Sequence, residues 1–148
     1  MRSDDGTLPE DSALAGWGPM FIKFCAKSGR DLDTIDRFKA RIENAGFINV
    51  HVKEYKVPVG DWAKNPHLKE AGRLLKQQLL AGLEGYAMMI LTTFGEPQPW
   101  TAEEVQVYLA KIRNEANNGG FHFYQQMRRV WVSLQFLVPY IPPFLESY

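Results

Sequence analysis

The residues that most often carry chemistry are scattered along this chain. Three histidines are present, without the spacing of a zinc site: His51, His67 and His122. The acidic pair Asp4-Asp5 could supply site carboxylates, although such a pair more often forms a solvated turn. The basic pair Arg128-Arg129 could meet an anion or simply lie exposed at a strand end. These residue types and spacings name no reaction, and they indicate no metal site.

Short catalytic motifs give the same result. The chain contains no G-x-S-x-G nucleophile elbow, no P-loop and no G-x-G-x-x-G. Gly119-Gly120 follows a predicted helix, so it is read as a helix stop and not as a phosphate-binding loop. The single cysteine, Cys25, lies among aromatic and aliphatic residues and is predicted to be a buried, inert thiol. No catalytic residue can be named from the motifs.

The composition indicates an intracellular globular protein. A chain of 148 residues can bury the core of one domain, and its 17 acidic and 17 basic residues cancel. Neutral charge gives no electrostatic sign of a nucleic-acid partner. The acidic start lacks the apolar run of a signal peptide, and no segment is apolar enough to span a membrane. With one cysteine, we expect a reducing compartment, either cytoplasmic or nuclear.

A helix, a glycine and a strand are predicted in succession within residues 34–52. Four apolar residues recur at helical spacing and form one stripe: Ile35, Phe38, Ile42 and Ala45. Asp33 or Thr34 can cap the helix start. Gly46 can end the helix in the left-handed conformation, with Phe47 folding back on the last turn. The following residues, 48–57, alternate with period two and predict a strand, which makes this an α/β unit.

The apolar residues change parity within that strand. Ile48, Val50 and Val52 are out of phase with Tyr55, Val57 and Val59. Either a bulge interrupts the strand, or its far end buries the opposite face. Pro58 and Gly60 are expected to end it, and a loop carrying Trp62 follows.

Helices are predicted on both sides of the α/β unit. One starts near Asp11 or Ser12, with a kink or restart at Pro19, and ends at residues 28–30. A long amphipathic helix starts at Pro66, with a kink or a close helix contact at Gly82 and Gly85. Its end, residues 86–91, is apolar all round and is predicted to be buried.

The last part of the chain adds a helix and a second strand. Thr101-x-x-Glu104 forms a capping box for a helix that residues 117–120 stop, and Glu115 is assigned to the solvated face of that helix. Residues 121–134 predict the strand, with a break near residues 125–129. The expected order is helix, helix, strand, two or three helices, strand.

Several of these motifs occur in a familiar order. They are Arg2-Ser3-Asp4-Asp5-Gly6-Thr7-Leu8, the helix followed by Ala45-Gly46-Phe47, Tyr55-Lys56-Val57-Pro58-Val59-Gly60-Asp61-Trp62, Leu83-Glu84-Gly85-Tyr86, and Trp100-Thr101-Ala102-Glu103-Glu104-Val105-Gln106-Val107-Tyr108-Leu109-Ala110-Lys111. Together they resemble the C-terminal part of the fungal LaeA-like (TAM-type) methyltransferases, which use S-adenosylmethionine. The resemblance covers roughly residues 2–132.

The resemblance implies the C-terminal part of a class I, Rossmann-like methyltransferase fold. Residues 48–57 would be the sixth strand and residues 121–132 the antiparallel seventh, under a largely helical cover. The family holds its cofactor on a glycine-rich loop and an acidic residue of the other half, which this chain is expected to lack. We therefore assign residues 1–135 to the substrate-side part of a methyltransferase domain and residues 136–148 to a divergent, apolar, proline-rich tail.

The resemblance implies methyl transfer by the complete protein, and the methyl acceptor stays unknown. We expect this chain alone to bind no S-adenosylmethionine and assign it no cofactor-binding residue. Trp17, Trp62 and Tyr86 are the candidates for lining the substrate pocket, or else they are core aromatics. The alternative function is a non-catalytic protein-interaction module or a methyltransferase remnant. An open strand edge would also allow self-association.

Overall fold

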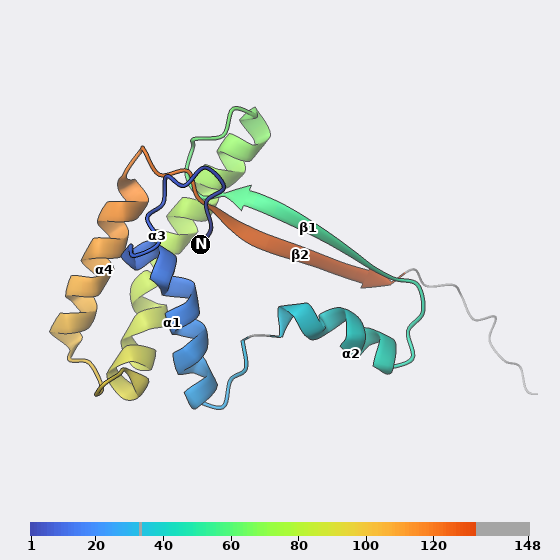
Figure 1. Ribbon diagram of the computed structural model, residues 1–148, viewed down its shortest axis with the longest axis horizontal. Coiled ribbons are helices and arrows are strands. Elements are labelled where there is room, and N and C mark those ends of the chain that lie inside the picture. The colour runs from blue at the N-terminus through green and yellow to red at the C-terminus, as the bar shows by residue number, and fades with distance from the viewer. Residues whose placement is uncertain (33, 133–148) are drawn as a thin grey trace, which may run out of the picture.

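The computed structural model describes residues 1–32 and 34–132, so the predicted tail, residues 136–148, lies outside the described residues. The elements follow the predicted order (Figure 1). They are α1 (Ala13–Lys27), the 3₁₀ helix η1 (Ile35–Arg37), α2 (Phe38–Asn44), β1 (Val50–Pro58), α3 (Pro66–Phe94), α4 (Ala102–Asn117) and β2 (Tyr124–Val132). The fold is α/β, with a two-stranded antiparallel sheet in the part that the structure describes.

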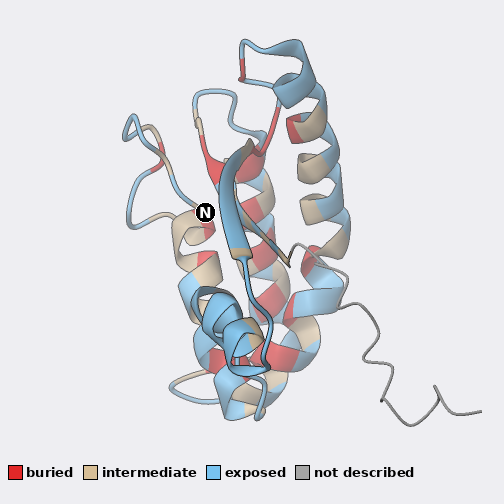
Figure 2. Ribbon diagram, turned by 90° about the vertical axis from the view of Figure 1, so that its right-hand side faces the viewer, coloured by how far each residue is buried: buried red, intermediate tan, exposed pale blue. Residues whose placement is uncertain are grey.

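The core lies among α1, α3 and α4, which pack against one another at one end of the molecule (Figures 1 and 2). Its largest fully buried side chains come from these helices and from the segments that flank the strands: Leu14, Val59, Leu83, Leu91, Val105, Leu109, Ile112 and Phe123. Cys25 is buried in the same core, and burial raises the pKa of its thiol, which agrees with an inert role. The helical cover therefore carries the stability of the described chain.

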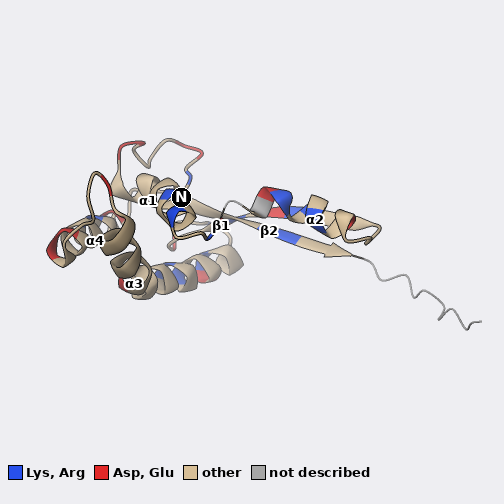
Figure 3. Ribbon diagram, turned by 90° about the horizontal axis from the view of Figure 1, so that it is seen from below, with Lys and Arg blue, Asp and Glu red and all other residues tan. Residues whose placement is uncertain are grey.

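The two strands form one long antiparallel ribbon that extends away from α1, α3 and α4, with α2 alongside it (Figure 3). Their register runs without interruption from Val50 opposite Val132 to Pro58 opposite Tyr124. The predicted bulge and the predicted break near residues 125–129 are therefore wrong. Val57 is half-buried and Val59 is buried, as expected if the far end of the strand turns its other face to the core.

The N-terminal segment pairs with the free side of β2 at a single point. Arg2 and Tyr124 exchange two backbone hydrogen bonds, with N···O distances of 3.1 and 2.9 Å. Beyond this bridge, no strand in the described part of the chain pairs with that edge of β2. Self-association through this edge stays a prediction.

The helix predicted within residues 34–45 forms only in part. It splits into η1 and α2, and the α2 N-cap, Arg37, makes no side-chain capping bond. Asp33 lies outside the described residues. The C-terminal prediction is confirmed, because Gly46 has φ +90° and donates its N–H to Glu43, while Phe47 donates to Ile42. The helix buries no residue fully, and Phe38 remains 43% exposed because only the narrow ribbon lies beneath α2.

Helix α1 begins at the predicted position. The hydroxyl of Ser12 accepts the N–H of Ala15, and the helix runs through Pro19 to Lys27. A second cap comes from α4, where the Glu115 carboxylate accepts the N–H groups of Ala13 (3.1 Å) and Leu14 (2.7 Å). The assignment of Glu115 to a solvated face was therefore wrong. The carboxylate satisfies free donors and lies at the positive end of the α1 dipole.

Helix α3 is a single element of 29 residues that starts with an Asn65 cap and Pro66. It approaches the end of β1 at Gly72, whose carbonyl accepts the N–H of Gly60 at 2.9 Å. A Cβ placed on Gly72 would lie 2.1 Å from the Gly60 carbonyl oxygen, so only glycine fits this contact. This close approach fixes the ribbon against the helices.

Two further expectations concern α3 and α4. The prediction that residues 86–91 are buried all round is wrong for Tyr86 and Met89, which are 57% and 50% exposed. The capping box of α4 is confirmed, since Thr101 and Glu104 exchange both bonds. No helix among the described residues is long and apolar enough to cross a membrane.

Candidate functional site

Trp17 and Tyr86, two of the predicted substrate-lining residues, face the same pocket. The pocket has a volume of about 310 Å³ and lies between α1, α3 and the start of β2. Apolar side chains form most of its remaining wall: Met1, Leu75, Leu79 and Met127. Gln78 and Gln125 add two amides that could orient a polar group. A mostly apolar wall with few polar groups is typical of a small-molecule site.

The two aromatic residues contribute differently to this pocket. Trp17 is 8% exposed and stacks on Phe21, at 5.4 Å between ring centroids, so it is also a core residue. Phe21 in turn meets the Tyr86 ring edge-on at 6.3 Å. Tyr86 lies at the rim over Gly82, where an added Cβ would come within 2.6 Å of the Tyr86 ring. Gly82 was predicted to mark a kink or a close helix contact in α3. It instead leaves room for the Tyr86 ring.

Trp62 lies elsewhere. Its ring stacks on His122, with centroids 5.2 Å apart, and its Nε1–H donates to the Phe123 carbonyl at 3.1 Å. It is not among the residues that line the pocket of Trp17 and Tyr86. The structure therefore brings two of the three predicted residues together and places the third in a separate cluster.

That cluster contains a carboxylate–imidazole pair. His122 Nδ1 lies 2.7 Å from Asp5 Oδ2, and the Asp5 carboxylate also accepts hydrogen bonds from Ser3 and Thr7. The bonds from Ser3, His122 and Thr7 hold the pKa of Asp5 well below its usual range. A charged carboxylate at Nδ1 favours the tautomer with its proton there, which leaves Nε2 as an acceptor. The arrangement is that of a general base, although its imidazole is partly exposed.

No local pattern indicates this pair, because 117 positions separate Asp5 from His122. The neighbouring Asp4 is also engaged. It accepts hydrogen bonds from Lys56 at 2.6 Å and from the Tyr124 hydroxyl at 2.9 Å, and these bonds lower its pKa. The acidic pair is thus more than a solvated turn, since it ties the N-terminal loop to both strands.

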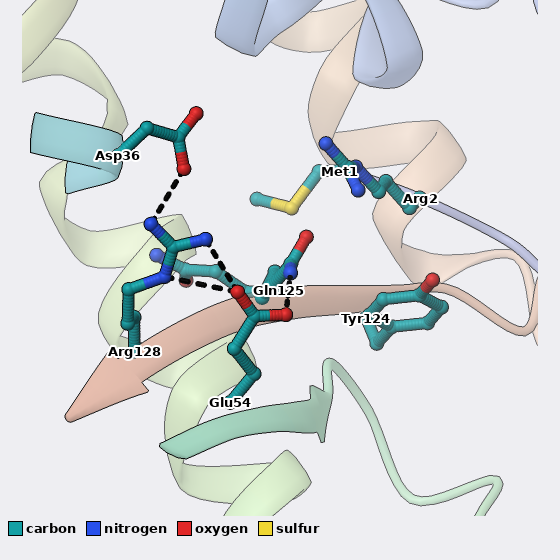
Figure 4. Close-up of a pocket in the computed structure, with 8 residues that line it drawn as sticks. Met1, Arg2, Asp36, Glu54, Tyr124, Gln125 and Arg128 are labelled. Atoms are coloured by element: carbon teal, nitrogen blue, oxygen red, sulfur yellow. Dashed lines mark hydrogen bonds and ion pairs between the residues drawn. The ribbon is translucent and has the colours of Figure 1, made fainter. Parts of the chain in front are cut away.

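A second, polar pocket of about 550 Å³ lies between the N-terminus, η1 and the two strands (Figure 4). Arg128 contributes its guanidinium, which binds Glu54 of β1 and, at 2.6 Å, Asp36 of η1. The pKa of Glu54 falls because Arg128 donates to it. Both acids thus compensate the charge of Arg128. Among the described residues, no group of three His, Cys, Asp or Glu side chains could hold a metal ion.

Comparison with known proteins finds relatives that are fungal methyltransferases. Methyltransferase pytC of Aspergillus terreus is 38% identical over 122 residues, which are 82% of this chain and 37% of pytC. The homologues of this chain are fungal methyltransferases. They include LaeA-like regulators of secondary metabolism, which confirms the resemblance.

Two further relatives agree. Probable methyltransferase tdiE of Emericella nidulans is 28% identical over 84% of this chain and 38% of its own length. Secondary metabolism regulator LAE1 of Cochliobolus heterostrophus is 29% identical over 89% of this chain and 42% of its own length. The chain thus spans 37% to 42% of the length of these three relatives. No family model matches the chain, and no solved structure matches it.

Proposed function

We propose that this chain forms the substrate-side part of a class I, S-adenosylmethionine-dependent methyltransferase, and that methyl transfer requires the complete protein. The observation that carries the proposal is the apolar pocket of about 310 Å³ with Trp17 and Tyr86 in its wall. A volume of this order suits a small organic acceptor. The similarity to methyltransferases over most of the chain supports the reaction class.

The described residues of this chain do not fit the cofactor. Within residues 1–132, β1 is the strand that is followed by a helix, and the connecting loop carries one glycine, Gly60, which α3 already contacts. Gly119-Gly120 follows α4 and does not open a helix. We therefore assign no cofactor contact to this chain. When bound, S-adenosylmethionine supplies the methyl group on its sulfonium.

The proposed role of this chain is to bind and orient the methyl acceptor. Trp17 forms the rigid inner wall, because its ring is buried and stacked on Phe21. Tyr86 closes the rim, where its exposure leaves the ring free to adjust to an acceptor. Holding two reactants in a water-poor pocket can lower a barrier by several kcal/mol, roughly 7–11 in the best cases.

A chimera tests the proposal. The matched segment of pytC is replaced by this chain, and binding of S-adenosylmethionine is measured by isothermal titration. Methyl transfer is then followed with labelled cofactor in an extract of a strain that lacks pytC. We expect the chimera to bind cofactor and to transfer methyl groups, whereas this chain alone should bind none.

Substitutions in the chimera locate the acceptor site. Tyr86→Ala should reduce methyl transfer with cofactor affinity unchanged. Leu74→Ala is the matched control, because Leu74 lies on the same helix, is 53% exposed and is not among the residues that line the pocket. A specific one-to-one complex of this chain alone with S-adenosylmethionine would contradict the proposal. So would equal transfer by the Tyr86→Ala chimera and its parent.

The second candidate is a non-catalytic interaction module. The observation that favours it is the large exposed surface around the ribbon, where α2 buries no residue and several large side chains of both strands face solvent. Such exposure in a chain of balanced charge is typical of a surface that binds another protein.

A further inference from the structure

The two faces of the ribbon differ in how far their side chains are buried. One face carries Glu54 and Arg128 and lies against the η1–α2 segment, through the ion pair between Arg128 and Asp36. Every residue that β2 places on this face is half-buried or buried. On the opposite face, the same strand presents only exposed residues. The first face is therefore partly covered by the chain itself, mainly along β2.

Cross-strand pairs build the exposed face. The register sets His51 opposite Trp131, Lys53 opposite Arg129 and Tyr55 opposite Met127. We call these six residues the aromatic–basic face. The imidazole of His51 stacks on the Trp131 indole, with centroids 5.4 Å apart. The rings of Trp131 and Tyr55 stay 37% and 39% exposed.

The charges of this face are not compensated. Lys53 and Arg129 lie directly opposite each other, an arrangement that weakens a sheet when both residues carry the same charge. Within the described part of the chain, both cations lie over aromatic rings of their own strands: Lys53 is 5.2 Å from the Tyr55 ring and Arg129 is 5.2 Å from the Trp131 ring. Among the described residues, no carboxylate forms an ion pair with either cation. An anionic group is thus the simplest complement to this pair.

We propose that the aromatic–basic face docks an acidic polypeptide segment of another protein. A carboxylate placed between Lys53 and Arg129 would meet both cations and could bind the guanidinium through two hydrogen bonds. Apolar side chains on either side of it would cover Trp131 and Tyr55, residue types that dominate binding energy at protein interfaces. This proposal does not rest on methyl transfer, because none of the four charged and aromatic residues that carry it lines the Trp17–Tyr86 pocket, and only Met127 belongs to both.

The size of the face favours a peptide over other anionic partners. Nucleic-acid binding depends on several phosphate contacts, and this face supplies only two cations, Lys53 and Arg129, on a chain of zero net charge. A membrane surface likewise requires clusters of basic residues or a broad apolar face. Two cations between two aromatic rings match one short segment that carries one or two carboxylates.

The test measures fluorescence anisotropy of a short labelled peptide that carries two central glutamates flanked by leucine and phenylalanine. The full chain is titrated into this probe and into a version with lysine in place of glutamate. We expect saturable binding of the acidic probe and none of the lysine version. Lys53→Glu together with Arg129→Glu should weaken binding by about tenfold or more.

The control carries the same change in net charge outside the face. Lys64→Glu together with Lys69→Glu should leave binding unchanged, since neither lysine belongs to the ribbon. Lys53→Glu alone is a second variant for the case in which the double variant does not fold. It places opposite charges across the strands, so it should keep the fold while binding is lost. Circular dichroism verifies the fold of each variant.

Three results would overturn the proposal. The first is no saturable binding of the acidic probe, and the second is an equal loss in the control variant. The third is a preference for single-stranded DNA or for vesicles that contain phosphatidylserine. None of these results bears on cofactor binding by the chimera, so the two proposals fail separately.

Discussion

Gly72→Ala probes the contact that joins the ribbon to the helices. An added Cβ would lie 2.1 Å from the Gly60 carbonyl oxygen and 3.1 Å from that of Pro58. Both atoms belong to the backbone, so no side chain can rotate away. The end of β1 must shift by roughly 1 Å, since carbon–oxygen contacts normally lie near 3.3–3.6 Å. The 2.9 Å bond from Gly60 N–H to the Gly72 carbonyl would be strained by the same shift.

The expected cost follows from three contributions. Overpacking costs about 1–3 kcal/mol, and loss of one hydrogen bond costs about 1 kcal/mol. Alanine in a helix returns about 0.5–1 kcal/mol relative to glycine. The net expectation is that Gly72→Ala destabilises the fold by about 1–3 kcal/mol.

Thermal unfolding followed by circular dichroism measures the effect. For a domain of this size, 1 kcal/mol corresponds to about 2–4 °C in Tm, so we expect a fall of about 3–10 °C. Gly85→Ala is the matched control in the same helix, because no heavy atom lies within 4 Å of its added Cβ. It should raise Tm by a few degrees, about 2–4 °C. An unchanged or higher Tm for Gly72→Ala would refute the argument.

Three other substitutions should change stability in different ways: one should lower it, one should alter its pH dependence and one should raise it. Gly46→Val should destabilise by about 1 to a few kcal/mol in urea denaturation, because Gly46 has φ +90° and valine resists that conformation; an unchanged midpoint would contradict this. Glu96 has its pKa lowered from 4.5 to about 2 by two lysines of α1, so its contribution is present above pH 4.5 and lost as the pH falls toward 2. Glu96→Gln should therefore flatten the acid side of a plot of Tm against pH. Lys53→Glu should stabilise the ribbon by about 0.2–1 kcal/mol in urea denaturation, since it faces Arg129.

The parts of the fold that the sequence predicted correctly depend on neighbours within a few positions. The capping box of Thr101 and Glu104 and the stop at Gly46 each need only the adjacent turn of the chain. The pairing of β1 with β2 was also expected, although through family resemblance and not from local pattern. The two capping predictions succeeded because backbone capping is decided locally.

The incorrect predictions involve partners far away in the sequence. Glu115 caps α1 across about a hundred positions, and nothing near it in sequence signals that role. Tyr86 was expected to be buried because its neighbours are apolar, yet helix packing leaves it at a pocket rim. Composition also gives no sign that Trp62 and Trp17 lie in different clusters, since an aromatic residue in a loop or a helix can meet either one; a contact of Trp62 with the acceptor stays a prediction.

The bridge between Arg2 and Tyr124 also indicates how β2 could associate with another strand. In an antiparallel pair, residues alternate between the two edges of a strand. Tyr124 bonds to Arg2 on one edge, whereas the carbonyl of Phe123 accepts the N–H of Val59 on the other. The backbone groups of Gln126 and Val130 therefore point to the same edge as Tyr124, where the described chain provides no further strand.

An edge of this kind pairs readily with a second copy of the chain. We expect association that grows with protein concentration in size-exclusion chromatography with multi-angle scattering. Val130→Pro should abolish it while the fold survives, because proline is tolerated where the lost N–H faces outward. Trp131→Pro should instead disrupt the ribbon, since its N–H points toward β1. A monodisperse monomer with a sharp cooperative melt would refute self-association, because an exposed edge would then be stable without a partner.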